Sequence, residues 1–141
     1  MMITLKQARQ MVDTALDTGA SAGWKPLSAV VLDAGGHVQA FARGDGAAPG
    51  RFEIARAKAY GAVMLGMGGK AQMARAEAQG YFMAAVNGIY GGQTCPVPGG
   101  VLIRDSDGAV IGAMGVTGDT SDNDAEAALA GIAAAGLIGE A

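Results

Sequence analysis

The stretch VLDAGGHVQAF, Val31 to Phe41, places two glycines between two runs of mostly apolar residues. Apolar runs on either side of a short glycine-containing segment are typical of a β-hairpin. Glycine supplies the positive φ angle that tight turns require. The pattern therefore predicts a buried strand from Leu27 to Asp33, a turn over the glycines, and a second strand from His37 to Arg43.

A second stretch repeats this pattern further along the chain. DSDGAV, Asp105 to Val110, aligns with DAGGHV, Asp33 to Val38: each begins with aspartate, has glycine at the fourth position and ends with valine. Ala109 takes the place of His37 in the repeat, so the turn does not depend on the imidazole. We interpret both segments as structural turns and His37 as an exposed residue at the start of a strand.

Helical patterns surround the two hairpins. Thr4 and Gln7 fit a capping box for a first helix, which Gly19 is placed to end. Further helices are expected from Arg51 to about Leu65 and from Lys70 to Gln79. Residues 80–92 are ambiguous and are assigned to turns and short helix.

The second hairpin is expected to pair strands near Val101–Asp105 and Ala109–Val116. A last helix begins after a cap at Ser121 or Asp122. The resulting order, αββααββα, predicts an α+β fold in which helices pack on an antiparallel sheet.

The composition favours one domain that associates with copies of itself. The chain has 141 residues and is half apolar, yet only 5% of its residues are aromatic and 24 are glycine. Small side chains each bury little area. We therefore expect residues 1–141 to form a single domain, and further apolar surface to be buried in a homo-oligomer.

The net charge argues against a nucleic-acid partner, and the hydropathy argues against a membrane partner. A net charge of −3 and a pI of about 4.9 leave too few cations to neutralise a phosphate backbone, so no nucleic-acid partner is expected. No apolar run has the length that crosses a bilayer, and the first residues lack the features of a signal peptide. The expected location is the cytoplasm, without a membrane partner.

The single histidine and the single cysteine carry little chemistry by themselves. A metal site requires several converging ligands, and His37 has no second histidine or cysteine at a suitable spacing, so no protein-bound metal is predicted. Axial coordination of a haem is the main route by which His37 could touch a ligand. Cys95 is interpreted as a small buried residue rather than a reactive thiol.

Two polar segments are more informative. In PGGV, Pro98 to Val101, the backbone N–H groups could form a nest for a carboxylate or an oxyanion; alternatively, the glycines allow another backbone to approach at a subunit interface. In GVTGDTSDND, Gly115 to Asp124, a strand leads into a helix whose N-terminus the aspartates cap. A sharper interpretation gives Asp124 a cation or a substrate hydroxyl to hold.

These segments occur in an order that resembles a known family. VVLDAGGHVQAFARGDGA, IARAKA, PGGVLI and DGAVIGAMGVTG, followed by Asp124, resemble the GlcG/HbpS-like family of haem-degrading or haem-binding domains, which includes the C-terminal domain of PduO-type proteins. The resemblance extends from the first helix to AGIAAAGL at residues 130–137. It implies a five-stranded antiparallel sheet flanked by helices, and assembly into dimers or rings as large as octamers.

The resemblance also assigns residues. It implies a ligand pocket whose binding residues are Arg43, Lys58, Gly99, Gly100 and Thr117, and whose catalytic residues would be Lys58, Asp124 and Asp45. Family members often have serine where this chain has Thr117, and many have proline where it has Leu102.

Three functions are compatible with this resemblance. The first is a haem- or tetrapyrrole-binding accessory protein, oligomeric and without catalysis, that stores or senses its cofactor. The second is an enzyme of the tautomerase, isomerase or hydrolase type acting on a small organic acid in a catabolic pathway. In it, Arg43 or Lys58 would pair with a carboxylate, the Gly99 and Gly100 amides would stabilise an oxyanion, and an aspartate would move a proton. The third is a purely structural subunit.

Overall fold

The computed structural model describes residues 1–141 and confirms the α+β prediction. Five helices and five strands follow one another along the chain: α1 (Leu5–Ser21), β1 (Ser28–Asp33), β2 (Val38–Arg43), α2 (Arg51–Leu65), α3 (Gly69–Ala78), α4 (Gly80–Ile89), β3 (Gly100–Arg104), β4 (Val110–Thr117), α5 (Ser121–Ala134) and β5 (Ile138–Glu140).

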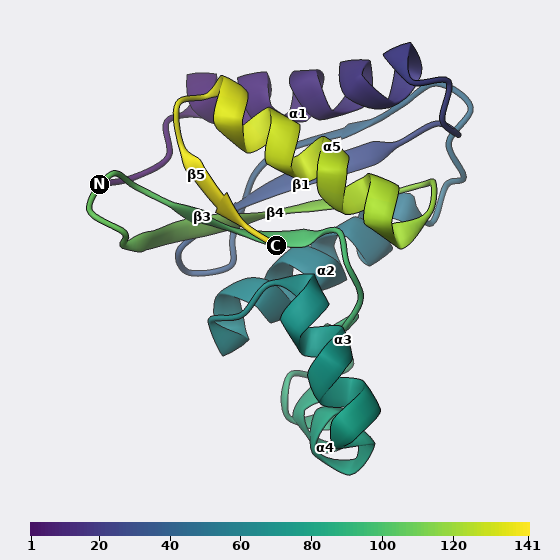
Figure 1. Ribbon diagram of the computed structural model, residues 1–141, viewed down its shortest axis with the longest axis vertical. Helices are drawn as coiled ribbons and strands as arrows, with labels where there is room; N and C mark the ends of the chain where they lie inside the picture. Colours follow the sequence, from purple (N-terminus) through teal and green to yellow (C-terminus); the bar gives the residue numbers. More distant parts are fainter.

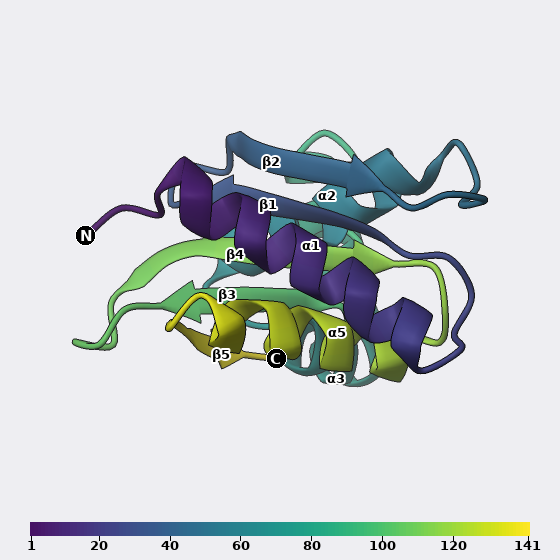
Figure 2. The same ribbon diagram turned by 90° about the horizontal axis from the view of Figure 1, so that it is seen from above.

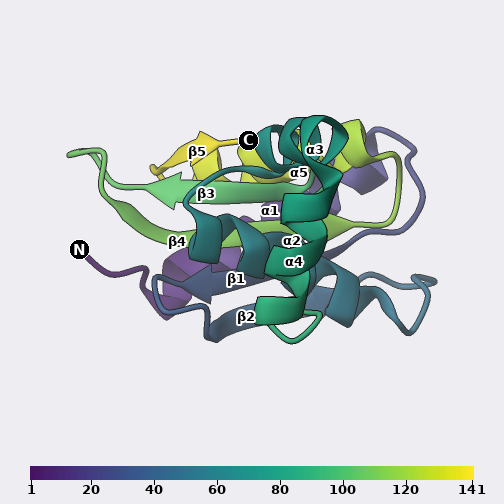
Figure 3. The ribbon, with the colours of Figure 1, turned by 90° about the horizontal axis from the view of Figure 1, so that it is seen from below.

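The strands form one sheet in the order β2-β1-β4-β3-β5, and every neighbouring pair is antiparallel. Helices α1 and α5 lie side by side on one face of the sheet (Figures 1 and 2), and α2 crosses the other face (Figure 3). Helices α3 and α4 continue away from the sheet on the α2 side (Figure 1). The central strand β4 therefore has helices above and below it.

The two hairpin turns have the same structure, as their sequences predict. In each, the Oδ1 atom of the first aspartate accepts hydrogen bonds from backbone N–H groups two and four residues later, at 2.9 Å for Asp33 and at 3.0 Å for Asp105. The glycines at the fourth position, Gly36 and Gly108, both have φ near +83°. An aspartate that bonds its own backbone in this way fixes a turn without help from its neighbours.

The sheet separates two apolar cores. On one face, large side chains such as Met11, Val31, Met114 and Ile132 fill the space beneath α1 and α5. On the other face, α2 contacts the sheet through small residues, which lets the helix backbone come close to the strands; these are Ala55, Ala59 and Ala62. This close approach of α2 determines which side chains meet at the end of β4.

Some predicted boundaries are wrong. Helix α1 does not end at Gly19 but continues to Ser21. The glycine serves packing instead, since a Cβ there would lie 2.5 Å from Leu27 Cδ1. Helix α5 is capped by Thr120, whose hydroxyl accepts from the N–H of Asn123, rather than by Ser121 or Asp122. The contact of Gly19 with Leu27 joins two different elements, whereas the capping bond of Thr120 spans only three residues and lies within the range of a sequence pattern.

Two further elements lie in segments without a clear sequence pattern. The ambiguous residues 80–92 include a regular helix, α4, with the exposed apolar residues Tyr81 and Ile89. A short edge strand, β5, pairs with β3. No helix combines the length and the apolar character needed to span a membrane.

Candidate functional site

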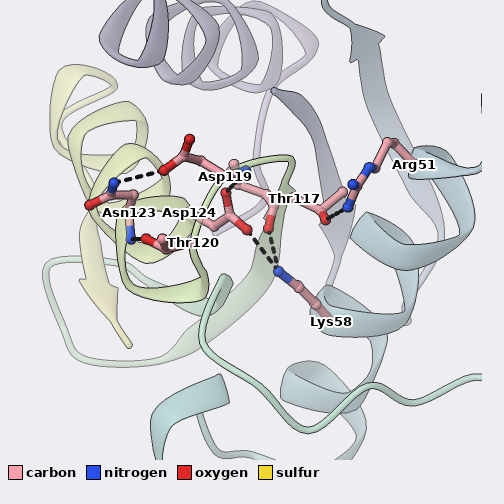
Figure 4. Close-up of polar contacts among 8 residues, drawn as sticks. Arg51, Lys58, Thr117, Asp119, Thr120, Asn123 and Asp124 are labelled. Carbon is pink, nitrogen blue, oxygen red and sulfur yellow. Dashed lines mark hydrogen bonds and ion pairs between the residues drawn. The ribbon is translucent and has the colours of Figure 1, made fainter. Parts of the chain in front are cut away.

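A buried ion pair connects α2 with α5 at the end of β4. The Lys58 Nζ atom lies 3.1 Å from Asp124 Oδ2 and donates a hydrogen bond of 3.1 Å to the carbonyl oxygen of Val116 (Figure 4). Lys58 exposes 3% of its surface and Asp124 exposes 1%. Charges removed from water in this way require a partner, and each residue supplies it for the other.

The second carboxylate oxygen of Asp124 also accepts a hydrogen bond. Its Oδ1 atom accepts a hydrogen bond of 3.0 Å from the N–H of Asp119, in the turn between β4 and α5. Asp124 thus holds this turn and the lysine together. Of the two interpretations of Asp124, helix capping or the binding of a cation or substrate hydroxyl, the structure shows a cation, and that cation is the ammonium of Lys58 from another element.

The paired glycines give Lys58 its space. Gly99 has φ +116°, and a Cβ on it would lie 2.9 Å from Lys58 Nζ. A Cβ on Gly100 would collide with the backbone carbonyl of Lys58. Of the two interpretations drawn from the sequence, the structure shows close approach of a second backbone; that backbone belongs to α2 of the same chain.

Thr117 lies next to the ion pair and contacts a residue that the sequence did not single out. Its Oγ1 atom accepts a hydrogen bond of 3.0 Å from Arg51 Nη1 at the start of α2 (Figure 4). Thr117 exposes only 2% of its surface. Its neighbour in the sheet, Ser28, has a buried hydroxyl without a hydrogen-bond partner. The position of Arg51 directly after the helix cap Gly50 is the only sequence signal that could have indicated its role.

The turn after Thr117 carries a dense hydrogen-bond network. Asp119 accepts from the side chain of Asn123 at 2.8 Å and from the backbone N–H of Lys25 at 2.9 Å. The hydrogen bond from Asn123, together with the backbone N–H groups of Lys25 and Thr120, lowers the pKa of Asp119 below its ordinary value of 3.8. The carboxylate therefore fastens the segment before β1 to the end of β4.

Arg43 and Asp45 do not join this group. Both are exposed: Arg43 is the last residue of β2 and Asp45 follows it, and they line a cleft together with Trp24 and Lys25 from the segment before β1. The structure therefore separates the residues expected in one pocket into two places: Lys58, Gly99, Gly100, Thr117 and Asp124 in a closed cluster, and Arg43 and Asp45 in an open cleft.

His37 occupies the exposed turn between β1 and β2. Its Nδ1 atom lies 3.3 Å from Asp33 Oδ1, and its side chain is 82% exposed. Burial opposes ionisation of Asp33, but backbone hydrogen bonds from His37 and Gly35 and the charge of His37 outweigh it and lower the pKa of Asp33. No group of three or more His, Cys, Asp or Glu side chains converges as a metal site would require.

The closed cluster performs a definite structural task. It joins α2, the end of β4 and the start of α5 through charges and hydrogen bonds that water does not reach. The Lys58 ammonium is enclosed, and two of its three possible donors are already used. In this conformation a substrate has no access to it.

The architecture is that of an α+β protein with an antiparallel sheet in the order β2-β1-β4-β3-β5, with α2 on one face and α1 and α5 on the other. The chain belongs to the HbpS-like family: the family model described as haem degrading protein HbpS-like matches residues 3–133. No protein in the curated set of sequences matches it.

Solved structures have the same fold. HbpS superposes with a TM-score of 0.82 at 28% identity, covering 94% of this chain and 89% of HbpS. Protein ORFY of Klebsiella pneumoniae has a TM-score of 0.80 at 26% identity, covering 95% and 90%. The PduOC–haem complex has a TM-score of 0.88 and covers both chains completely, at 20% identity, so this likeness concerns the fold alone.

Proposed function

We propose that this protein binds haem or a related iron tetrapyrrole at its surface and acts as an oligomeric accessory protein that stores or senses the cofactor. Membership of the HbpS-like family supports a haem-related role. PduOC, which has this fold, has been crystallised as a complex with haem. The chain must then offer a ligand for the iron and a surface for the porphyrin.

The observation that carries the proposal is the contact between Asp33 and His37. A carboxylate that holds one ring nitrogen of histidine orients the ring and leaves the other nitrogen free for a metal, as in many metal sites. Here Asp33 Oδ1 lies 3.3 Å from Nδ1, and no residue of the chain bonds Nε2. With 82% of its side chain exposed, His37 can reach an iron that approaches from solvent. The turn prediction for His37 is confirmed, and the same turn presents the imidazole as a ligand.

Aromatic, apolar and cationic side chains lie beside this turn. A Cβ on Gly36 would lie 3.0 Å from Met64 and 3.1 Å from Tyr60, so the turn rests on these residues of α2. Tyr60 makes an edge contact with Tyr90, and the guanidinium of Arg56 lies 5.1 Å from the ring centre of Tyr60. Aromatic faces suit a porphyrin, and an arginine suits its propionates. When bound, haem would supply the iron; the protein would bind and orient it.

Self-association is part of the proposal. Helix α4 projects from the body (Figure 1) and exposes 77% of Tyr81 and 76% of Ile89. Exposed apolar side chains gathered on one projecting element favour a contact with a second copy. Burying them would add the apolar area that a core rich in alanine and glycine lacks.

No observation gives comparable support to the alternative function, an enzyme that acts on a small organic acid. Its expected carboxylate-binding lysine, Lys58, is enclosed and paired with Asp124. Arg43 and Asp45 lie outside the closed cluster. The catalytic roles of Lys58, Asp124 and Asp45 remain predictions of the family resemblance.

A haemin titration of the purified protein tests the proposal. We expect saturable binding with a shifted Soret band, a loss of at least tenfold in affinity for His37→Ala, and recovery of the band when free imidazole is added to the variant. Tyr81→Phe removes another exposed polar donor and should leave the band unchanged. Absence of saturable binding to the unmodified protein would refute the haem function. Binding that His37→Ala leaves intact would assign the iron to another donor, such as Tyr90.

A further inference from the structure

A cleft of about 470 Å³ lies between the end of α1 and the end of β2. These two ends are on the right of Figure 2. Its walls come from the second half of α1, from the segment Trp24–Leu27, and from residues 43–45 at the end of β2. The haem proposal makes no use of this cleft. A volume of this size suits a small molecule.

The walls of the cleft are fixed by contacts elsewhere. The N–H of Lys25 donates to Asp119 Oδ1 at 2.9 Å, and the N–H of Trp24 donates to the carbonyl of Gly19 in α1 at 3.0 Å. On the opposite wall, the N–H of Gly44 donates to the carbonyl of Leu27 at 2.9 Å, and a Cβ on Gly44 would lie 2.6 Å from that oxygen. The cleft is therefore largely formed before any ligand binds.

Its lining combines an apolar floor with four charges. Leu16, Leu27 and the ring of Trp24 supply apolar surface; the charged residues are two cations, Lys25 and Arg43, and two carboxylates, Asp17 and Asp45. None of these four side chains forms an ion pair or a hydrogen bond within the chain. Four charged groups that line one cleft and use none of their bonding capacity are available to a ligand.

The balance of charge selects the class of ligand. A ligand with only a carboxylate would be attracted by the two cations but repelled by Asp17 and Asp45. A ligand with only an ammonium would be attracted by the two aspartates but repelled by the two cations. A molecule that carries both an ammonium and a carboxylate can satisfy both pairs at once. We propose that this cleft binds a zwitterion, an α-amino acid whose apolar side chain lies against Trp24.

Trp24 is the only tryptophan of the chain, so its fluorescence reports on this cleft alone. We expect leucine to change the fluorescence in a saturable manner. Two analogues separate the charges: 4-methylpentanoate lacks the ammonium and 3-methylbutylamine lacks the carboxylate, and each should bind at least tenfold more weakly. Phenylalanine tests whether an aromatic side chain is also accepted.

Arg43→Gln and Asp45→Asn should each weaken leucine binding at least tenfold. Both residues are exposed, so neither variant removes a buried group, and circular dichroism checks that each is folded. Arg9→Gln, on the exposed side of α1, is the matched control and should bind as the unmodified protein does. The proposal is overturned if leucine produces no saturable signal in fluorescence and no heat in calorimetry. It is also overturned if 4-methylpentanoate binds as tightly as leucine, because the cleft would then recognise a plain organic anion. Haemin binding is measured separately, so the two proposals fail independently.

Discussion

Lys58 and Asp124 come from helices on opposite faces of the sheet, yet their charged atoms lie 3.1 Å apart around the end of β4. The sheet ends here, so the two helices can meet without crossing a strand. Val116 and the backbone of Gly99 complete the enclosure of the ammonium. The pair therefore joins the two layers of helices at one end of the molecule.

Breaking this pair should destabilise the protein strongly. Lys58→Met leaves the Asp124 carboxylate buried without its cation, a change that costs about 3–5 kcal/mol in free energy of unfolding. Chemical denaturation measures this cost. Lys70→Met, on the exposed surface of α3, is the control and should change stability by less than about 0.5 kcal/mol. A loss in Lys58→Met no larger than that of the control would show that the pair does not hold the layers together.

The double variant Lys58→Met/Asp124→Leu should be less destabilised than Lys58→Met alone. Removing both charges leaves no unpaired ion in the interior, and apolar replacements of buried pairs are often tolerated. The coupling between the two sites, measured in a double-mutant cycle, is expected to exceed about 1 kcal/mol. Additive losses would mean that the two charges do not interact.

Replacing Gly99 should also destabilise the protein, through crowding and backbone strain rather than through the loss of a charge. Gly99→Ala places a Cβ 2.6 Å from the carbonyl oxygen of Val116 and 2.9 Å from Lys58 Nζ, at a φ of +116°, which side chains rarely adopt. We expect a loss of about 1–3 kcal/mol, measured by denaturation, from crowding and backbone strain. Gly80→Ala at the start of α4 meets no atom within 4 Å and should be neutral or slightly stabilising. Equal effects of the two variants would contradict the importance of close approach.

A structural feature of this fold could be predicted from the sequence where the contacts that produce it join residues close together along the chain. The two hairpin turns were predictable because Asp33 and Asp105 each bond backbone groups at most four residues away. The sheet and most helices follow from apolar periodicity. Helix α4 was predicted only as turns and short helix. Apolar residues lie on both its buried side (Met83, Val86) and its exposed side (Tyr81, Ile89), so the amphipathic pattern is weak.

The site depends on contacts that no short-range pattern contains. Lys58 and Asp124 are separated by 66 positions, and only the family resemblance grouped them. The same resemblance grouped Arg43 and Asp45 with them, whereas the structure places these two in the open cleft. Arg51 was missed because its partner, Thr117, lies 66 positions away at the end of β4. Residues that the same family resemblance groups together therefore need not lie in the same site.

The two turn aspartates should contribute unequally to stability. Asp105 exposes 5% of its surface, whereas the side chain of Asp33 is 42% exposed. Each accepts two backbone hydrogen bonds, and alanine would leave those N–H groups without a partner. We expect Asp105→Ala to cost about 2–3 kcal/mol and Asp33→Ala about 1 kcal/mol, because water can replace the lost acceptor only at the exposed turn. Denaturation of both variants measures the difference, and the reverse order would contradict this account.

Stability should fall in acid partly through Asp119. The hydrogen bond from Asn123, followed by those from Lys25 and Thr120, lowers the pKa of Asp119 in the folded protein below its ordinary 3.8, so the folded state binds this proton less readily than the unfolded chain. The stabilisation is therefore fully present above pH 3.8 and is lost as the pH falls through the lower, folded value. Asp119→Asn should be less stable than the unmodified protein near pH 6, and the difference should shrink below pH 4, as measured by thermal unfolding at a series of pH values. Asp13→Asn, at an exposed residue of α1 without a hydrogen-bonding partner, is the control and should change stability near pH 6 by less than about 0.5 kcal/mol. A gap between Asp119→Asn and the unmodified protein that widened in acid would reverse the sign of this linkage and refute the role given to Asp119.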